Sequence, residues 1–474
     1  MKARIILLAI VSASLLFSIN GRSQELTPSP ASPKATLTSA ARAKIDKSVR
    51  DILAKTGAPS ASIAVVKDGK LAYTHAYGFA DVAAHKAATI AMRYSIGSIS
   101  KQFTSTALLL LSEEGKLSLD DKVSRWLPDI NNANQVTLRE VLSMTAGYQD
   151  FWPEDYVMPS MMKPTTAPDI LNGWARKPLD FEPGTKWQYS NTSYVIAGVI
   201  LEQVAGTSLT DFLQKRIFAP LEMKDVYNSD AAALPAGEPT RYQRFGLGPV
   251  RPAPKEGKGW MFAAGELAMT ATDLAKWDIS MIEQTVLKPS SYHEMEKEVL
   301  LKNDAGTRYG LGVGVSLVKG RRVISHGGEV SGFTAENVVY PDDHAAVVVL
   351  TNLDASRAAP EIADKIADVL FAPTGSGGAL ATAKQIFSGL QQGTIDRALF
   401  TSNANAYFST QALKDLSASL GPLGKPNDFS EAAEGLRGGM TFRRYTVQFA
   451  KKKLSVVTYE MSDGKLEQYI VAGE

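Results

Sequence analysis

The sequence predicts an α+β fold: one antiparallel sheet flanked by helices with a helical subdomain, followed by a small C-terminal α+β domain. Within residues 41–371, strand-and-turn patterns lie near both ends and helical patterns fill the middle, which indicates one sheet built from distant parts of the chain. Residues 372–382 include a Pro/Gly/Ser-rich run and predict a linker to an accessory domain at 383–474. At 474 residues the chain is longer than one core usually grows to, which agrees with two folded units.

Residues 1–23 are typical of a secretory signal peptide. Lys2 and Arg4 form a positive start, and the apolar run at 5–19 is too short to cross a bilayer comfortably. The alternative is an uncleaved membrane anchor, so cleavage stays open at this point. Residues 24–40, rich in Pro, Ser, Thr and Ala, predict a flexible lead-in. We therefore expect a periplasmic or secreted protein with no stable membrane span after signal cleavage.

Composition argues against several classes of protein. The formal charge of +2 gives no reason to expect a nucleic-acid partner. The chain has no cysteine, so a disulfide framework and a thiol nucleophile are excluded. The five histidines are scattered, and His293-Glu294 lacks the second histidine of a zinc-protease motif because position 297 is Lys297. We expect no metal and no other cofactor, and the oligomeric state stays open.

The secondary-structure elements follow from apolar periodicity and from turn residues. An early hairpin is expected at 61–66 and 71–77 around Asp68-Gly69. The other expected strands of the first domain are 310–318, 321–325, 335–340 and 345–350, and its helices are 103–114, 138–144, 194–204 and 273–281. In the accessory domain, helices are expected at 383–390 and 412–420 and strands at 440–449, 454–461 and 466–471. This domain shows no catalytic pattern and could bind a ligand, form a dimer or act as a lid.

The first chemical signal is Ser98-Ile99-Ser100-Lys101 at the start of an apolar helix. A serine and a lysine three residues apart lie on one helical face, and a helix start favours developing negative charge. Burial disfavours the charged form of lysine, so Lys101 could accept the serine proton near neutral pH. Taken alone, the pattern is more often a capping serine beside a surface lysine.

Two later segments change that interpretation. Tyr189-Ser190-Asn191 lies on an expected loop just before a helix, where a tyrosine can relay a proton and an amide can hold substrate and orient Lys101. Ser325-His326-Gly327-Gly328-Glu329 ends an expected strand, and its glycines would let the backbone approach a substrate closely. The Gly-x-Ser-x-Gly pattern of α/β-hydrolases is absent from the chain.

These three elements, in this order, resemble those of the penicillin-recognising serine enzymes. The branch they resemble contains class C β-lactamases, D-Ala-D-Ala carboxypeptidases, D-aminopeptidases and related esterases. The resemblance covers about 41–371 and includes supporting segments at 93–98, 142–147 and 264–270. It implies a β-lactamase-like fold for this domain and a serine hydrolase that forms an acyl-enzyme.

The resemblance also implies residue roles. Ser98 would attack the substrate carbonyl, and Lys101 and Tyr189 would share the general-base and general-acid work, with the first base left open. Asn191 would contact the substrate. The backbone N–H groups of Ser98 and Glu329 would form the oxyanion hole, and His326-Gly327-Gly328 would line the substrate-binding strand.

One departure from the family pattern bears on the substrate. Many members have Lys-Thr-Gly where this chain has His326-Gly327-Gly328, and a mostly neutral imidazole beside a glycine is a poorer partner for a carboxylate. We therefore expect a small-molecule ester, amide or peptide substrate, as for an esterase or a D-amino-acid peptidase. The alternatives are a β-lactamase or D-Ala-D-Ala carboxypeptidase, and a catalytically silent ligand-binding protein on the same scaffold.

Overall fold

The computed structural model describes residues 36–154, 156–371, 376–461 and 464–473. The predicted signal peptide at 1–23 and most of the predicted lead-in lie outside the described residues. The first helix, α1 (Ser39–Thr56), begins inside the range expected as lead-in, because the Thr38 side chain caps it by accepting a hydrogen bond from the Ala41 N–H.

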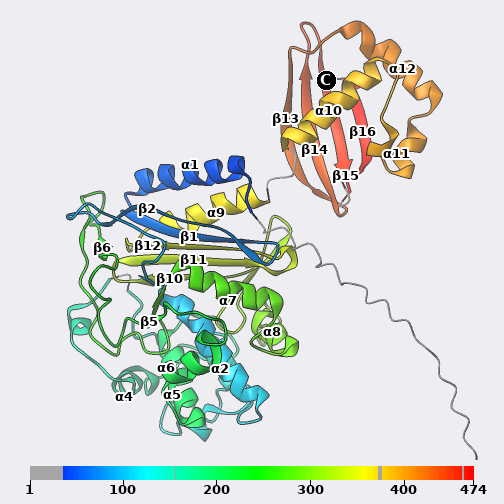
Figure 1. The fold of residues 1–474 in the computed structure, drawn as a ribbon. Coiled ribbons are helices and arrows are strands. Elements are labelled where there is room, and N and C mark those ends of the chain that lie inside the picture. Colours follow the sequence, from blue (N-terminus) through cyan, green and yellow to red (C-terminus); the bar gives the residue numbers. More distant parts are fainter. Residues whose placement is uncertain (1–35, 155, 372–375, 462–463, 474) are drawn as a thin grey trace, which may run out of the picture. The chain divides into compact units, whose positions relative to one another are not determined.

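The larger domain is built on one antiparallel sheet of seven strands in the order β3-β2-β1-β12-β11-β10-β9 (Figure 1). The early hairpin pairs with a late strand, in a register that sets Ala61 opposite Thr351. The expectation of one sheet made from distant parts of the chain is therefore confirmed. The strands are β1 (Ser60–Lys67), β2 (Lys70–Asp81), β3 (Lys86–Ala87), β9 (Gly314–Val318), β10 (Arg321–Val330), β11 (Phe333–Tyr340) and β12 (Ala345–Thr351).

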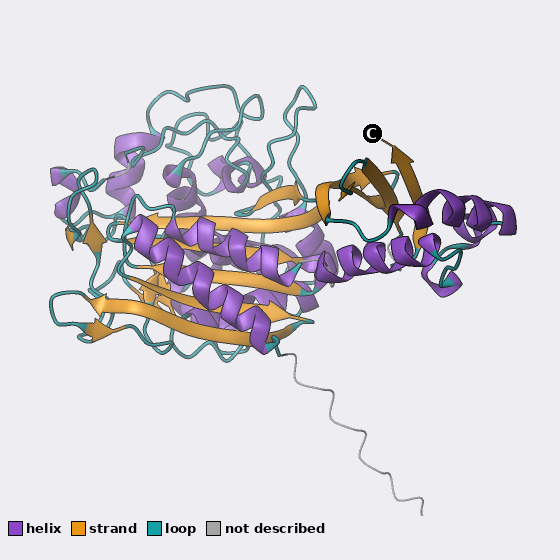
Figure 2. Ribbon diagram, turned by 90° about the horizontal axis from the view of Figure 1, so that it is seen from above, coloured by secondary structure: helices purple, strands orange, loops and turns teal. Residues whose placement is uncertain are grey.

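Helices cover both faces of this sheet. On one face, α1 packs beside α9 (Ala358–Leu370), and the two helices lie side by side across the strands in Figure 2. On the other face lies α7 (Ala271–Glu283), with the helical subdomain beyond it (Figure 1). Strand β1 is buried on both sides, and its alternate residues enter two different cores, as a central strand with covered faces requires.

The helical subdomain surrounds one nearly fully buried helix, α2 (Ser100–Glu113). The subdomain also contains short strands and π-helical turns. Its other helices are α3 (Leu138–Leu142), α4 (Ala167–Ile170), α5 (Asn191–Ala205), α6 (Leu209–Leu213) and α8 (Pro289–Glu296). Its short strands are β4 (Tyr94–Ser95), β5 (Tyr227–Asn228), β6 (Tyr242–Gln243), β7 (Arg251–Pro252) and β8 (Leu267–Met269). Within the described residues no single helix is long and apolar enough to cross a membrane, although the bent pair Asn191–Ala205 and Leu209–Phe218 passes on length and composition together.

In its described residues, the accessory domain has a four-stranded antiparallel sheet, three α-helices and its own apolar core. Its helices are α10 (Ser376–Gln391), α11 (Ser402–Tyr407) and α12 (Thr410–Leu420), and its strands are β13 (Asp428–Arg437), β14 (Met440–Gln448), β15 (Lys453–Glu460) and β16 (Leu466–Gly473). Helix α10 begins at Ser376, inside the range predicted as linker. Strand β13 was not predicted, because it is an edge strand whose residues are mostly exposed and carry no apolar alternation.

Candidate active site

The predicted nucleophile and its lysine face each other at the start of α2. Ser98 lies half-buried in a single 3₁₀ turn, Gly97–Ile99, that leads directly into the helix. Lys101 follows in the first turn of α2 and is fully buried. Its Nζ lies 2.9 Å from Ser98 Oγ, so the spacing of three residues brings the two groups into contact.

Lys101 uses all three of its donor positions inside the protein. Besides Ser98 Oγ, its Nζ donates to Asn191 Oδ1 at 2.9 Å and to the Ala264 carbonyl at 2.8 Å. Burial lowers the pKa of Lys101 to about 7, although the nearby carboxyl groups of Asp150 and Glu266 act in the opposite direction. A substantial share of Lys101 is therefore uncharged at neutral pH.

Tyr189 approaches Ser98 from the loop before α5. Its hydroxyl donates to Ser98 Oγ at 2.6 Å, and its ring centroid lies 4.9 Å from Lys101 Nζ. Burial raises the pKa of Tyr189 well above its ordinary value, so the group is a neutral phenol at pH 7. Tyr189 can therefore give a proton near Ser98 but is a poor first acceptor of one.

Two glycines bring strand β10 close to Ser98. Gly97 has a φ of +53°, and a Cβ atom there would lie 2.7 Å from the Glu329 backbone nitrogen. A Cβ atom on Gly328 would lie 1.9 Å from the Ile96 carbonyl oxygen. Any side chain at either position would force the strand and the turn apart. This close approach sets the Glu329 N–H beside the turn that carries Ser98.

His326 lies on β10 with both ring nitrogens engaged. Nδ1 lies 2.6 Å from the Gly327 carbonyl oxygen, and Nε2 lies 2.9 Å from the Tyr309 hydroxyl. Burial and the neighbouring Lys101 charge lower the pKa of His326 to about 4. The imidazole is therefore neutral at pH 7, as the sequence led us to expect.

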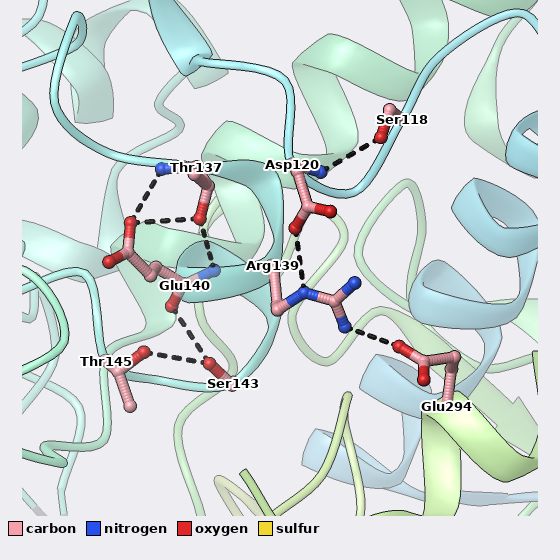
Figure 3. Close-up of polar contacts among 8 residues, drawn as sticks. All are labelled: Ser118, Asp120, Thr137, Arg139, Glu140, Ser143, Thr145 and Glu294. Carbon is pink, nitrogen blue, oxygen red and sulfur yellow. Dashed lines mark hydrogen bonds and ion pairs between the residues drawn. The ribbon is translucent and has the colours of Figure 1, made fainter. Parts of the chain in front are cut away.

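The loop that leads to the site begins at α3, where side-chain contacts hold it (Figure 3). Thr137 and Glu140 form a reciprocal capping box at the start of this short helix. Ser143 Oγ lies 2.9 Å from Thr145 Oγ1 just after the helix. Arg139 also ties this helix to its surroundings, through ion pairs with Asp120 and Glu294.

This loop in turn supports the tyrosine segment. The Met144 carbonyl accepts a hydrogen bond from the Gln188 N–H at 3.0 Å, directly before Tyr189. Further along the same loop, Asp150 accepts hydrogen bonds from the Asn191 N–H at 3.0 Å and from Asn191 Nδ2 at 3.3 Å. Because the carboxylate accepts from Nδ2, the amide oxygen of Asn191 is left facing Lys101.

Three site residues were missed by sequence reasoning: Asp150, the Ala264 carbonyl and Tyr309. Ala264 lies in a segment that the resemblance did mark, at 264–270, but a backbone carbonyl carries no sequence signal. Asp150 and Tyr309 are common polar residues on loops and show no motif of their own. In the folded chain, Asp150 contacts Asn191 and Tyr309 contacts His326.

The site opens into a cleft of about 640 Å³. Ser98, Tyr189, Asn191 and the strand residues 326–329 all line it. The described lining residues include several aromatic side chains and five acidic ones, but no lysine or arginine. Besides Tyr189, the aromatic residues are Phe151, Trp152, Tyr156 and Trp260, and the acidic residues are Asp150, Glu154, Glu329, Glu336 and Asp354. Among the residues that the structure describes, no group of three His, Cys, Asp or Glu could hold a metal ion.

The fold and this site agree with a known family. The family model described as Beta-lactamase matches residues 45–371, so the chain belongs to this family. Penicillin-binding protein 4* of Bacillus subtilis is 28% identical over 312 residues, which are 61% of this chain and 67% of the relative. D-aminopeptidase of Brucella ovis is 29% identical over 299 residues, which are 62% of this chain but only 57% of that protein.

Solved structures show the same fold. D-amino acid amidase from Ochrobactrum anthropi SV3, complexed with D-phenylalanine, matches 70% of this chain and 99% of its own, with 26% identity and a TM-score of 0.63. The octameric penicillin-binding protein homologue from Pyrococcus abyssi is 21% identical, with a TM-score of 0.62 over 91% of this chain and 99% of its own. At 21% identity, the match to the Pyrococcus abyssi protein shows a shared fold and nothing more. The sequence-based resemblance and the predicted fold class are confirmed.

The glycine geometry yields a matched pair of variants. Gly328→Ala should lower the acylation rate by about 100-fold, because moving β10 misplaces one oxyanion donor, and it should lower the melting temperature through overpacking. Gly327→Ala is the control, since its Cβ would meet no atom closer than 3.5 Å. Stopped-flow acylation and thermal unfolding measure both effects. Equal losses in the two variants would contradict the close-approach argument.

Proposed function

We propose that the chain is an exported serine hydrolase that acts through an acyl-enzyme on ester or small amide and peptide substrates. The observation that carries this proposal is the contact of Ser98 Oγ with both Lys101 Nζ and the Tyr189 hydroxyl, at 2.9 and 2.6 Å. A nucleophile with a base and an acid within hydrogen-bond reach is the arrangement that acyl transfer needs. Periplasmic or secreted localisation rests on the signal-peptide pattern of residues 1–23.

In the first step, neutral Lys101 accepts the Ser98 hydroxyl proton while Oγ attacks the substrate carbonyl carbon. A pKa of about 7 suits this task, because the base is then both available and strong enough near neutral pH. The tetrahedral oxyanion is held by the N–H groups of Ser98 and Glu329. The leaving amine or alkoxide departs with a proton from Lys101, relayed by Tyr189, and the acyl group stays on Ser98.

Deacylation reverses these roles. Water gives a proton to Lys101 as its oxygen attacks the ester carbonyl, and Ser98 Oγ leaves with a proton. Asn191 holds the substrate and, through its amide oxygen, keeps Lys101 Nζ directed at Ser98. Asp150 fixes the orientation of that amide. The hydrogen bonds of Lys101 to Asn191 and Ala264 thus hold its amine in position. A displacement of a catalytic group by about 1 Å is enough to lower the reaction rate strongly.

The charge of the cleft supports the substrate class. A carboxylate-bearing ligand would enter a space lined by five acidic side chains and by a neutral His326. Burial raises the pKa of Glu336 to about 7 and also raises the pKa values of Asp150 and Asp354, so Glu154 and Glu329 carry the most persistent charge. A neutral substrate, or one with an ammonium group, meets no such repulsion. The names of two relatives, D-aminopeptidase and D-amino acid amidase, agree with such substrates. The alternative, a β-lactamase or D-Ala-D-Ala carboxypeptidase, is favoured by the similarity to penicillin-binding protein 4*.

The pH dependence of acylation tests the role of Lys101. The rate should rise with pH along a limb centred near 7, because only the uncharged amine accepts the proton. Asp150→Asn removes a charge that raises the pKa of Lys101, so the limb should move to lower pH. The measurement is single-turnover acylation from pH 5 to 9. Asp211→Asn, an exposed carboxylate on α6, is the control, and an unmoved or upward-shifted limb in Asp150→Asn contradicts the assignment.

A matched substrate panel tests the substrate class. A D-aminoacyl p-nitroanilide or p-nitrophenyl ester with a free ammonium group should react about tenfold faster than its N-succinyl derivative, which replaces the ammonium by a carboxylate. An N-acetyl derivative separates loss of the ammonium from gain of the carboxylate. A chromogenic cephalosporin should be the slowest substrate. Efficient cephalosporin turnover would favour the β-lactamase alternative, and no reaction with any member would favour a silent binding protein.

A further inference from the structure

Tyr309 contacts the one histidine of the candidate site but has no place in the acyl-transfer steps. We propose that Tyr309 is a positioning residue that keeps His326 neutral and occupies its Nε2, so that a substrate carboxylate finds no partner on β10. This inference rests on the proposed function and names a specificity determinant of the same site. It adds two specific side chains to the cleft's overall charge as a cause of the discrimination against carboxylates.

The hydrogen-bond pattern gives the tautomer. A carbonyl oxygen can only accept, so the contact of His326 Nδ1 with the Gly327 carbonyl at 2.6 Å places a hydrogen on Nδ1. In a neutral imidazole the other nitrogen is then an acceptor. The Tyr309 hydroxyl, 2.9 Å from Nε2, is therefore the donor. No ring nitrogen of His326 keeps an N–H for a substrate.

The surroundings favour this state over a charged imidazole. Tyr309 is 6% exposed, and its ring lies edge-on to His326 with centroids 5.9 Å apart. Protonation of Nε2 would oblige the buried Tyr309 hydroxyl to turn its hydrogen away from Nε2 toward the Tyr194 hydroxyl, with which it also interacts, so the hydrogen bond that Nε2 accepts would be lost. The titratable groups packed around the pair are Lys101 on α2, Tyr189 before α5, Tyr194 on α5, and Glu336 on β11 opposite Gly327. Lys101 adds repulsion against a second positive charge.

Gly327, next to His326 on β10, also lacks a group that could bind a substrate carboxylate. Gly327 is exposed to the cleft and has no hydroxyl with which to hold a carboxylate. A Cβ atom at this position would have room, with Glu336 Oε2 as its nearest neighbour at 3.5 Å. Even a side chain placed there would thus point toward a carboxyl group. The strand therefore offers a bound carboxylate neither a cation nor a hydroxyl donor at 326–327.

Histidine NMR tests the tautomer directly in the wild-type protein. With ¹⁵N-labelled histidine, the His326 signals, assigned by their absence in His326→Asn, should show a protonated Nδ1 and a hydrogen-bonded, unprotonated Nε2 from pH 8 down to about 5.5. Titration near the ordinary value of about 6.5, or a proton on Nε2 in the neutral state, would overturn the proposal. This measurement needs no activity and no variant at Tyr309.

A paired-ester experiment tests the effect on specificity. Tyr309→Phe removes only the hydroxyl, so Nε2 becomes free to carry a proton when a carboxylate is bound beside it. The preference for a carboxylate-bearing aryl ester over its uncharged counterpart should rise about tenfold in this variant at pH 6, and less at pH 8. Tyr292→Phe, which removes a buried hydroxyl bonded to the Ser280 carbonyl, is the control and should leave the preference unchanged.

The outcomes separate the two proposals. An unchanged ester preference together with an unchanged Nε2 signal in Tyr309→Phe overturns the role of Tyr309 while acylation persists. If neither ester acylates the wild-type protein, the proposed function fails, and the NMR result still decides whether Tyr309 holds His326. A Tyr309→Phe protein that does not fold leaves the wild-type tautomer and its pH range as the deciding observation.

Discussion

The site depends on the burial of one amine. Lys101 is fully enclosed, and such a group is tolerated only when hydrogen bonds replace the water it has lost. Its three acceptors come from three separate parts of the chain: the turn before α2, the start of α5 and the segment that carries Ala264. Loss of any acceptor would leave a buried donor unpaired, so the same contacts that stabilise this region also aim the base at Ser98.

The rest of the architecture maintains that enclosure. Helix α5 packs against α2, and Gln102 of α2 is hydrogen-bonded to Asn337 of β11 and to Trp277 of α7, so α2 keeps almost no exposed surface. Gly97 and Gly328 then let β10 close the remaining side at a backbone-to-backbone approach that no other residue permits. The lowered pKa values of Lys101 and His326 and the raised pKa of Tyr189 have the same main cause, which is burial.

The sequence predicted those features of the fold and the site that depend on residues close together in the chain. The contact between Ser98 and Lys101 follows from helical spacing, and the sheet from two hairpins with clear turns. The contacts of Asp150 with Asn191 and of Lys101 with Ala264 join residues 41 and 163 positions apart, and no short pattern encodes them. Strand β13 and the start of α10 were missed because an exposed edge strand and a Gly-rich helix start lack apolar periodicity. The net charge of the chain, formally +2, says nothing of where charges gather, and the five acidic side chains that line the cleft became visible only in the folded structure.

The central claim is that Ser98 becomes acylated with Lys101 as its base, and intact-mass spectrometry tests it most directly. After brief exposure to an activated ester or a fluorophosphonate, the wild-type protein should gain one adduct that peptide mapping places on Ser98. Ser98→Ala should gain none, and Lys101→Met should gain it far more slowly although Ser98 is intact. An adduct on another residue, or equally fast labelling of Lys101→Met, would contradict the account.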